Sequence, residues 1–144
     1  MKWIHPDQIS VQREAQDWQE AVRLSGELLV SGGMVEASYV DAMIETTREL
    51  GPYCVLAPGI AMPHARPDET VKQTGFSAVT LNEPVEFGNP DNDPVYLVIG
   101  LCALDHDAHI EALARMAESV SRPGFLEEVK QAQSVDELDG ILNH

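Results

Sequence analysis

One histidine stands out as a group that could do chemistry, because it follows a short apolar segment and lies in a loop restrained by two prolines. The segment from Ala57 to Pro67 reads APGIAMPHARP and places His64 directly after Pro63. Pro63 fixes its own φ, and Pro67 disfavours helical dihedrals at Arg66, so this loop has little conformational freedom. A restrained imidazole at the end of a buried strand suits chemistry at a ring nitrogen, although a lone histidine is more often a structural residue bonded to a backbone carbonyl.

Two further histidines follow a second apolar run. His106 and His109 come after the run from Val95 to Ala103 and lie in the first turn of an expected helix. Because strand ends meet at the edge of a sheet, we expect that His64 can lie beside them. Two imidazoles and an arginine, without a nearby nucleophile, favour a histidine that itself accepts a group such as phosphoryl. Phosphoryl transfer needs little beyond positioning and electrostatic stabilisation.

The residue spacing disfavours other chemistries. No HExxH, HxxxH or paired-cysteine pattern supplies a zinc site, although a small zinc hydrolase that uses His64, His106 and His109 is an alternative. Neither the GxSxG elbow of serine hydrolases nor a Gly-rich phosphate loop is present. Cys54 and Cys102 lie in apolar surroundings without CxxC spacing, which predicts buried thiols. We therefore expect no metal and no cofactor.

Length and charge restrict the class of protein further. The chain has 144 residues, which suits one domain with one core. It has 24 Asp and Glu residues against 9 Lys and Arg residues, a formal net charge of -15. Such a surface repels phosphate backbones and anionic lipids, so we expect neither nucleic-acid binding nor direct membrane binding, whereas a basic protein partner would be attracted. The chain lacks a spanning-length apolar segment and a signal-peptide pattern, so the predicted localisation is cytoplasmic.

Hydrophobic periodicity predicts an α/β fold with a mixed sheet. Strands are expected at Ile9 to Ala15, in the run from Val55 to Met62, at Thr74 to Leu81 and, as the central strand, at Val95 to Ala103. Asn82 to Pro84 is predicted to form a turn. Helices are expected after an Asp17 cap, from Tyr39 to about Leu50 after a Ser38 cap, and after Asp105 or Asp107. A short helix is expected from Gly124 or Phe125 to Ala132, and a final one from a Ser134 capping box through Leu142.

The residues around His64 resemble a known phosphorylation-site signature. Glu49, Leu56-Ala57 and Ile60 to Ala65 are similar to the signature of the mannitol/fructose-type enzyme IIA domains (EIIA type 2) of the bacterial phosphoenolpyruvate-dependent sugar phosphotransferase system. The similarity extends over most of the chain and includes residues 39–43, 72–75, 93–95, 109–113 and 134–138. The tract GPYCVLAPGIAMPHARP looks most like the ascorbate-specific branch of these proteins.

This resemblance implies a fold and a mechanism. Residues 1–144 would form one EIIA domain, a mixed sheet flanked by helices on both faces. His64 would accept a phosphoryl group from the histidine phosphocarrier protein, and His109 and Arg48 would stabilise it. The group would bond Nε2, with Nδ1 held by a backbone carbonyl, and would then pass to a cysteine of a IIB component that serves a membrane IIC permease.

Several points stay open in the sequence. The resemblance implies uptake of a sugar-like substrate, with ascorbate preferred, but a regulatory IIA-like module without a transport role would use the same histidine. His106 has no counterpart in the signature, and we expect it to be a solvent-facing loop residue or else a local acid-base neighbour. A chain of 144 residues leaves no room for a IIB or IIC segment, so we expect these partners to be separate proteins.

Overall fold

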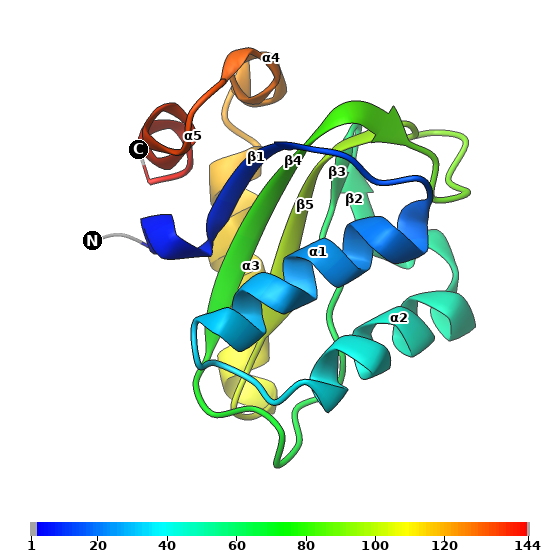
Figure 1. Cartoon of the computed structure of the whole chain (residues 1–144), viewed down its shortest axis with the longest axis vertical. Helices are drawn as coiled ribbons and strands as arrows, with labels where there is room; N and C mark the ends of the chain where they lie inside the picture. The colour runs from blue at the N-terminus through cyan, green and yellow to red at the C-terminus, as the bar shows by residue number, and fades with distance from the viewer. Residues whose placement is uncertain (1–2, 144) are drawn as a thin grey trace.

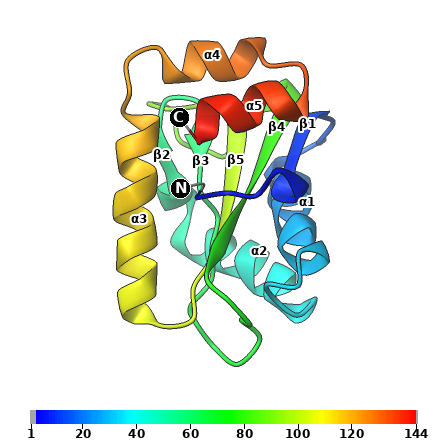
Figure 2. The same cartoon turned by 90° about the vertical axis from the view of Figure 1, so that its left-hand side faces the viewer.

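Helices cover both faces of a five-stranded sheet in the computed structural model, which describes residues 3–143 (Figure 1). Helices α1 and α2 lie on one face, and α3, α4 and α5 lie on the other (Figure 2). The helices are α1 (Trp18–Ser31), α2 (Ser38–Leu50), α3 (His106–Val120), α4 (Phe125–Gln131) and α5 (Val135–Leu142). The strands are β1 (Ile9–Arg13), β2 (Val55–Ala57), β3 (Ile60–Ala61), β4 (Gly75–Val85) and β5 (Val95–Cys102). The predicted α/β fold with helices on both faces is confirmed.

The sheet is mixed, as predicted, and its strand order is β1-β4-β5-β3-β2. Strand β5 lies in the middle and is buried at every residue except Tyr96, which confirms it as the central strand. It pairs antiparallel with β4 and parallel with β3, where Ile60 lies opposite Leu97. The parallel pair matters for function, because it brings the carboxyl ends of β3 and β5 to the same edge of the sheet.

Each face of the sheet has its own apolar core. Leu29 of α1 and Met43 of α2 are fully buried on one face, and Met116 of α3 and Leu138 of α5 are fully buried on the other. Burying an aliphatic side chain of this size contributes about 1.5–3 kcal/mol. The two cores therefore hold the histidine-bearing segments in place from both sides of the sheet. Within residues 3–143, no helix combines the length and the apolar character needed to cross a lipid bilayer.

Three helices begin at side-chain caps that the sequence predicted. Asp17 accepts a hydrogen bond from the Glu20 N–H group at the start of α1. Asp105, one of the two candidates for α3, accepts one from the Ala108 N–H group at 2.8 Å. Ser134 caps α5 in the same way. Each such cap satisfies a backbone donor that the helix itself leaves unpaired.

The predicted Ser38 cap of α2 is wrong. Helix α2 already includes Ser38, its N-cap is Ala37, and the cap residue makes no side-chain hydrogen bond. Backbone carbonyls take the place of the serine hydroxyl, since the N–H group of Tyr39 donates to the Glu36 carbonyl at 3.0 Å. At its other end the helix stops as predicted at Gly51, whose φ of 74° is a left-handed value that favours glycine.

The turn predicted at Asn82 to Pro84 is also wrong, because β4 continues through these residues to Val85. The pairing of β4 with β5 shifts register between Thr80 and Val85, and the intervening residues 82–84 are exposed. A proline cannot donate a ladder hydrogen bond, so it is tolerated where a register shift interrupts the ladder. The local turn signal was therefore overridden by pairing with a distant strand.

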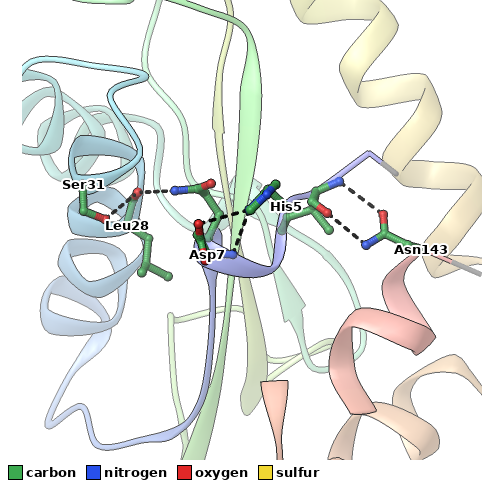
Figure 3. Close-up of polar contacts among 7 residues, drawn as sticks. His5, Asp7, Leu28, Ser31 and Asn143 are labelled. Atoms are coloured by element: carbon green, nitrogen blue, oxygen red, sulfur yellow. Dashed lines mark hydrogen bonds and ion pairs between the residues drawn. The ribbon is translucent and has the colours of Figure 1, made fainter. Parts of the chain in front are cut away.

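Polar contacts tie the two ends of the described chain together (Figure 3). The Asn143 side chain accepts hydrogen bonds from the backbone N–H groups of Trp3 and Ile4 at 2.8 and 3.2 Å, and donates one to the Ile4 carbonyl at 2.9 Å. Gln8 donates its side-chain amide to the Leu28 carbonyl near the end of α1. Residues 3–8 thus bridge the end of α5 on one face and α1 on the other.

Candidate functional site

His64 lies where the sequence predicted, beyond the end of β3. It forms an isolated parallel bridge with Leu101 of β5, and the Leu101 N–H group donates to the Pro63 carbonyl at 3.1 Å. The segment after β3 thus continues alongside the central strand without forming a regular strand of its own. This backbone contact fixes the position of the histidine relative to β5.

Alternation along this segment decides which face His64 occupies. Ile60 and Met62 belong to the core on the side of α3, whereas Ala61 and Ala65 belong to the core on the side of α1 and α2. Successive side chains of an extended segment point to opposite faces, so His64 shares the α3 side with Met62. The imidazole is half-buried there.

The Tyr39 hydroxyl holds the residue that follows His64. It accepts the Ala65 N–H bond at 3.1 Å and lies 2.8 Å from the Leu101 carbonyl oxygen, to which it donates. Burial raises the pKa of Tyr39, which keeps the phenol protonated as a donor. Sequence reasoning assigned Tyr39 only to the apolar face of α2. The available signal was that a buried tyrosine needs a partner for its hydroxyl.

One ring nitrogen of His64 is occupied and the other is free for chemistry. Nδ1 lies 3.0 Å from the Met62 carbonyl oxygen, and this carbonyl can only accept a hydrogen bond. In the neutral ring Nδ1 therefore carries the proton, and Nε2 carries the lone pair. The predicted contact between Nδ1 and a backbone carbonyl is present. This arrangement leaves Nε2 as the nucleophilic atom of the neutral imidazole.

His109 of α3 lies against His64, as the sequence predicted for the two strand ends. The ring centroids are 4.9 Å apart and the ring planes meet at 61°. The backbone N–H group of His109 donates to the Asp105 carbonyl, so the cap of α3 also positions this residue. Burial, and then the charges of His64 and His106, lower the pKa of His109. Its imidazole is therefore neutral at pH 7, with one nitrogen able to donate and the other to accept.

His106 is exposed, but it is the first residue of α3 rather than a loop residue. It acts on the site only through space, as one of the charges that lower the pKa of His109. Among residues 3–143, no group of three or more His, Cys, Asp or Glu side chains is placed to hold a metal ion. The three histidines therefore do not form a metal-binding cluster with one another or with neighbouring carboxylates in this part of the chain.

Among residues 3–143, Arg48 has no recorded contact with His64 or His109. Its guanidinium forms an ion pair with Glu45 and lies 5.9 Å from the ring centroid of Trp18. Arg48 lies in the last turn of α2, about 13 Å along the helix from Tyr39 at the usual rise per residue, and it is Tyr39 whose hydroxyl contacts Ala65. The role of Arg48 as a phosphoryl stabiliser stays a prediction that the resemblance implies.

The two cysteines are free and buried, as predicted. Burial raises the pKa of both Cys54 and Cys102 to about 11. Their thiols are therefore protonated at neutral pH, and neither competes with His64 as a nucleophile.

Comparison with known proteins shows that the chain is similar to components of a phosphotransferase system. Residues 2–144 match the family model described as "Phosphoenolpyruvate-dependent sugar phosphotransferase system, EIIA 2". Over 103 residues the chain is 50% identical to the ascorbate-specific PTS system EIIA component of Escherichia coli K12, which covers 72% of this chain and 67% of that protein.

Solved structures of enzyme IIA proteins have the same fold as this chain. The mannitol-specific cryptic phosphotransferase enzyme IIA of Escherichia coli superposes with a TM-score of 0.86 at 38% identity, over 98% of this chain and 95% of that chain. A mannitol enzyme IIA of Escherichia coli, solved in complex with phosphorylated enzyme IIB, superposes with a TM-score of 0.86 at 31% identity, over 99% of this chain and 98% of that chain. These likenesses cover nearly the whole chain, including both histidine-bearing segments.

Proposed function

The chain belongs to the EIIA type 2 family of the phosphoenolpyruvate-dependent sugar phosphotransferase system, and on this premise we propose that it carries a phosphoryl group on His64. The family acts as a phosphotransferase component. One observation carries the choice of residue: Nδ1 of His64 is held by the Met62 carbonyl, and the ring lies against His109. The imidazole is thus oriented with Nε2 available to a donor.

In the proposed step, the Nε2 lone pair of His64 attacks the phosphorus of a phosphohistidine on the donor. The new N–P bond forms as the donor's N–P bond breaks, and the electron pair of that bond returns to the donor imidazole. The Nδ1 proton stays on His64, where the Met62 carbonyl stabilises the positive charge that the ring acquires. His109 donates a hydrogen bond to an equatorial phosphoryl oxygen. One N–P bond replaces another, so the exchange is nearly balanced in energy.

The proposed donor is the histidine phosphocarrier protein, and the proposed acceptor is a cysteine of a IIB component that serves a membrane IIC permease. The similar mannitol enzyme IIA has been solved in complex with phosphorylated enzyme IIB, which supports a IIB partner. Leu104 and Ile110 supply exposed apolar surface next to the site, with exposed fractions of 53% and 51%. Such a surface around a reactive residue suits transient docking, and the net charge of -15 attracts a basic donor.

Ascorbate is the proposed substrate of the transport system. The support is the 50% identity to the ascorbate-specific component of Escherichia coli K12. The substrate itself does not bind at the histidine pair, because a IIA component handles only the phosphoryl group. Substrate choice therefore enters through recognition of a matching IIB protein.

The test of the carrier function is phosphorylation in a reconstituted system. The protein is incubated with phosphoenolpyruvate, enzyme I and the phosphocarrier protein, and its intact mass is measured for the wild type, His64→Ala and His109→Ala. We expect one acid-labile phosphoryl group on the wild type, none on His64→Ala and slower labelling of His109→Ala. Label on His64→Ala, or none on the wild type, would contradict the proposal.

A second stage of the same experiment separates transport from regulation. The phosphorylated protein is mixed with purified IIB proteins of the ascorbate and mannitol types, and the label on their cysteines is followed. We expect transfer to the ascorbate type to be faster. Labelling of His64 without transfer to any IIB protein would favour the regulatory module, and zinc that copurifies with an unlabelled protein would favour the hydrolase.

A further inference from the structure

We infer that Arg66 is the cation that neutralises the phosphoryl group on His64. This inference rests on the proposed function of His64. Arg66 lies two residues after His64 in the restrained loop, whereas Arg48 pairs with Glu45 beside Trp18.

The alternation that orients His64 also places Arg66. Ala65 is buried in the core on the side of α1 and α2, while His64 lies against His109 on the side of α3. Pro67 disfavours helical dihedrals at Arg66 and keeps its backbone extended. In an extended segment, residues two apart share a face, so Arg66 shares the face of His64. Arg66 is exposed there, in contrast to the buried Ala65 between them.

Hydrogen bonds hold the backbone segment that leads to Arg66. The Tyr39 hydroxyl bonds the N–H group of Ala65, and the Pro63 carbonyl accepts from Leu101. Two residues of extended chain span about 6.6 Å, a distance that an arginine side chain bridges. The guanidinium can therefore reach a phosphoryl group on Nε2 without a movement of the loop.

Arg66 is also free to bind an anion. Among residues 3–143 it has no hydrogen bond, ion pair or ring contact, whereas Lys72 pairs with Glu36 and Arg122 pairs with Glu128. No existing ion pair has to break before the guanidinium meets a phosphoryl group. Its planar donors match phosphate oxygens in a bidentate geometry, which a lysine cannot reproduce.

A cation near His64 would offset the negative charge of the phosphoryl group. A phosphoryl group adds a charge of about -1.5 to -2 near neutral pH. His109 has a lowered pKa and is neutral there, so it contributes a hydrogen bond rather than a full positive charge. The chain as a whole carries -15, and Asp68 and Glu69 follow closely in the same loop. Of all cationic residues, Arg66 is the nearest to His64 along the chain.

The experiment measures the equilibrium of phosphoryl exchange between the phosphocarrier protein and this chain. Arg66→Gln and Arg66→Lys are compared with the wild type, and Arg48→Gln serves as the matched control. We expect Arg66→Gln to shift the equilibrium about five- to tenfold towards the phosphocarrier protein, because a charge-assisted contact to the phosphoryl group is lost. Arg66→Lys should lie between the two, and Arg48→Gln should match the wild type.

The equilibrium constant separates this role from partner docking, because docked complexes do not enter the ratio of free phosphorylated and unphosphorylated proteins. A slower rate with an unchanged equilibrium in Arg66→Gln would assign Arg66 to docking and overturn the inference. A shift in Arg48→Gln without one in Arg66→Gln would also overturn it. In both cases the wild type is still labelled on His64, so the carrier function stands. Failure to label the wild type would instead contradict the carrier function itself.

Discussion

The Tyr39 hydroxyl replaces a backbone acceptor for the N–H group of Ala65. In a regular parallel pairing of His64 with Leu101, the Ala65 N–H group would donate to the Leu101 carbonyl. Here it donates to the Tyr39 oxygen at 3.1 Å, and the hydroxyl donates in turn to that carbonyl at 2.8 Å. A side chain from α2 is thus inserted into the ladder beside the candidate nucleophile. Helix α2, on the opposite face of the sheet, thereby takes part in positioning His64.

Removing this hydroxyl should weaken the fold and the site together. We expect Tyr39→Phe to lower the free energy of unfolding by about 1–3 kcal/mol, because the buried Ala65 N–H group loses its acceptor. Labelling of His64 should also slow, since the loop is held less firmly. Urea denaturation and the phosphorylation rate measure the two effects. Tyr53→Phe is the control, because Tyr53 is 81% exposed, and equal stability of the two variants would contradict the prediction.

The lowered pKa of His109 gives a defined pH dependence. Because burial and neighbouring imidazoles disfavour its protonated form, the unfolded chain binds this proton more tightly than the folded chain. The contribution of His109 to stability is therefore complete above about pH 6.5 and is lost as the pH falls through the interval below it. We expect His109→Gln to lose less stability than the wild type between pH 7.5 and pH 5, as measured by urea denaturation. Identical losses in the two proteins would rule this out.

The cap of α3 should influence both helix stability and the position of His109. Asp105 accepts a hydrogen bond from Ala108, and its own carbonyl accepts from the His109 N–H group. We expect Asp105→Ala to cost about 1 kcal/mol of unfolding free energy and to slow labelling of His64, because the first turn of α3 frays. Asp105→Asn keeps a capping oxygen and should retain most of both properties. If the Asn variant loses as much as the Ala variant, the hydrogen bond is not the cause.

Elements whose signals are local could be predicted well from the sequence. The caps Asp17 and Ser134 and the stop at Gly51 are specified by residues within one turn of each helix. The error at residues 82–84 has a non-local cause, whereas the error at Ser38 has a local one. Residues 82–84 became strand because β4 pairs with β5, and Ser38 was not needed as a cap because backbone carbonyls satisfied the same donors.

The same distinction applies to the candidate site. The meeting of His64 with His109 could be predicted, because each follows a buried strand and strand ends share an edge of the sheet. The contact of Arg48 with Trp18 could not, since it depends on the direction in which α2 crosses the sheet. The contact of Tyr39 with Ala65 depends on the same direction. Arg66, in contrast, follows from alternation within one loop and was within reach of sequence reasoning.

The parallel pairing of β3 with β5 determines where His64 lies relative to the central strand. Ile60 lies opposite Leu97 and His64 lies opposite Leu101, so one register runs from the strand to the imidazole. A slip by one residue would move His64 by about 3.3 Å and turn it to the face of α1 and α2, away from His109. The spacing of the two rings is therefore set by backbone hydrogen bonds, and substitutions that preserve this register leave that spacing intact.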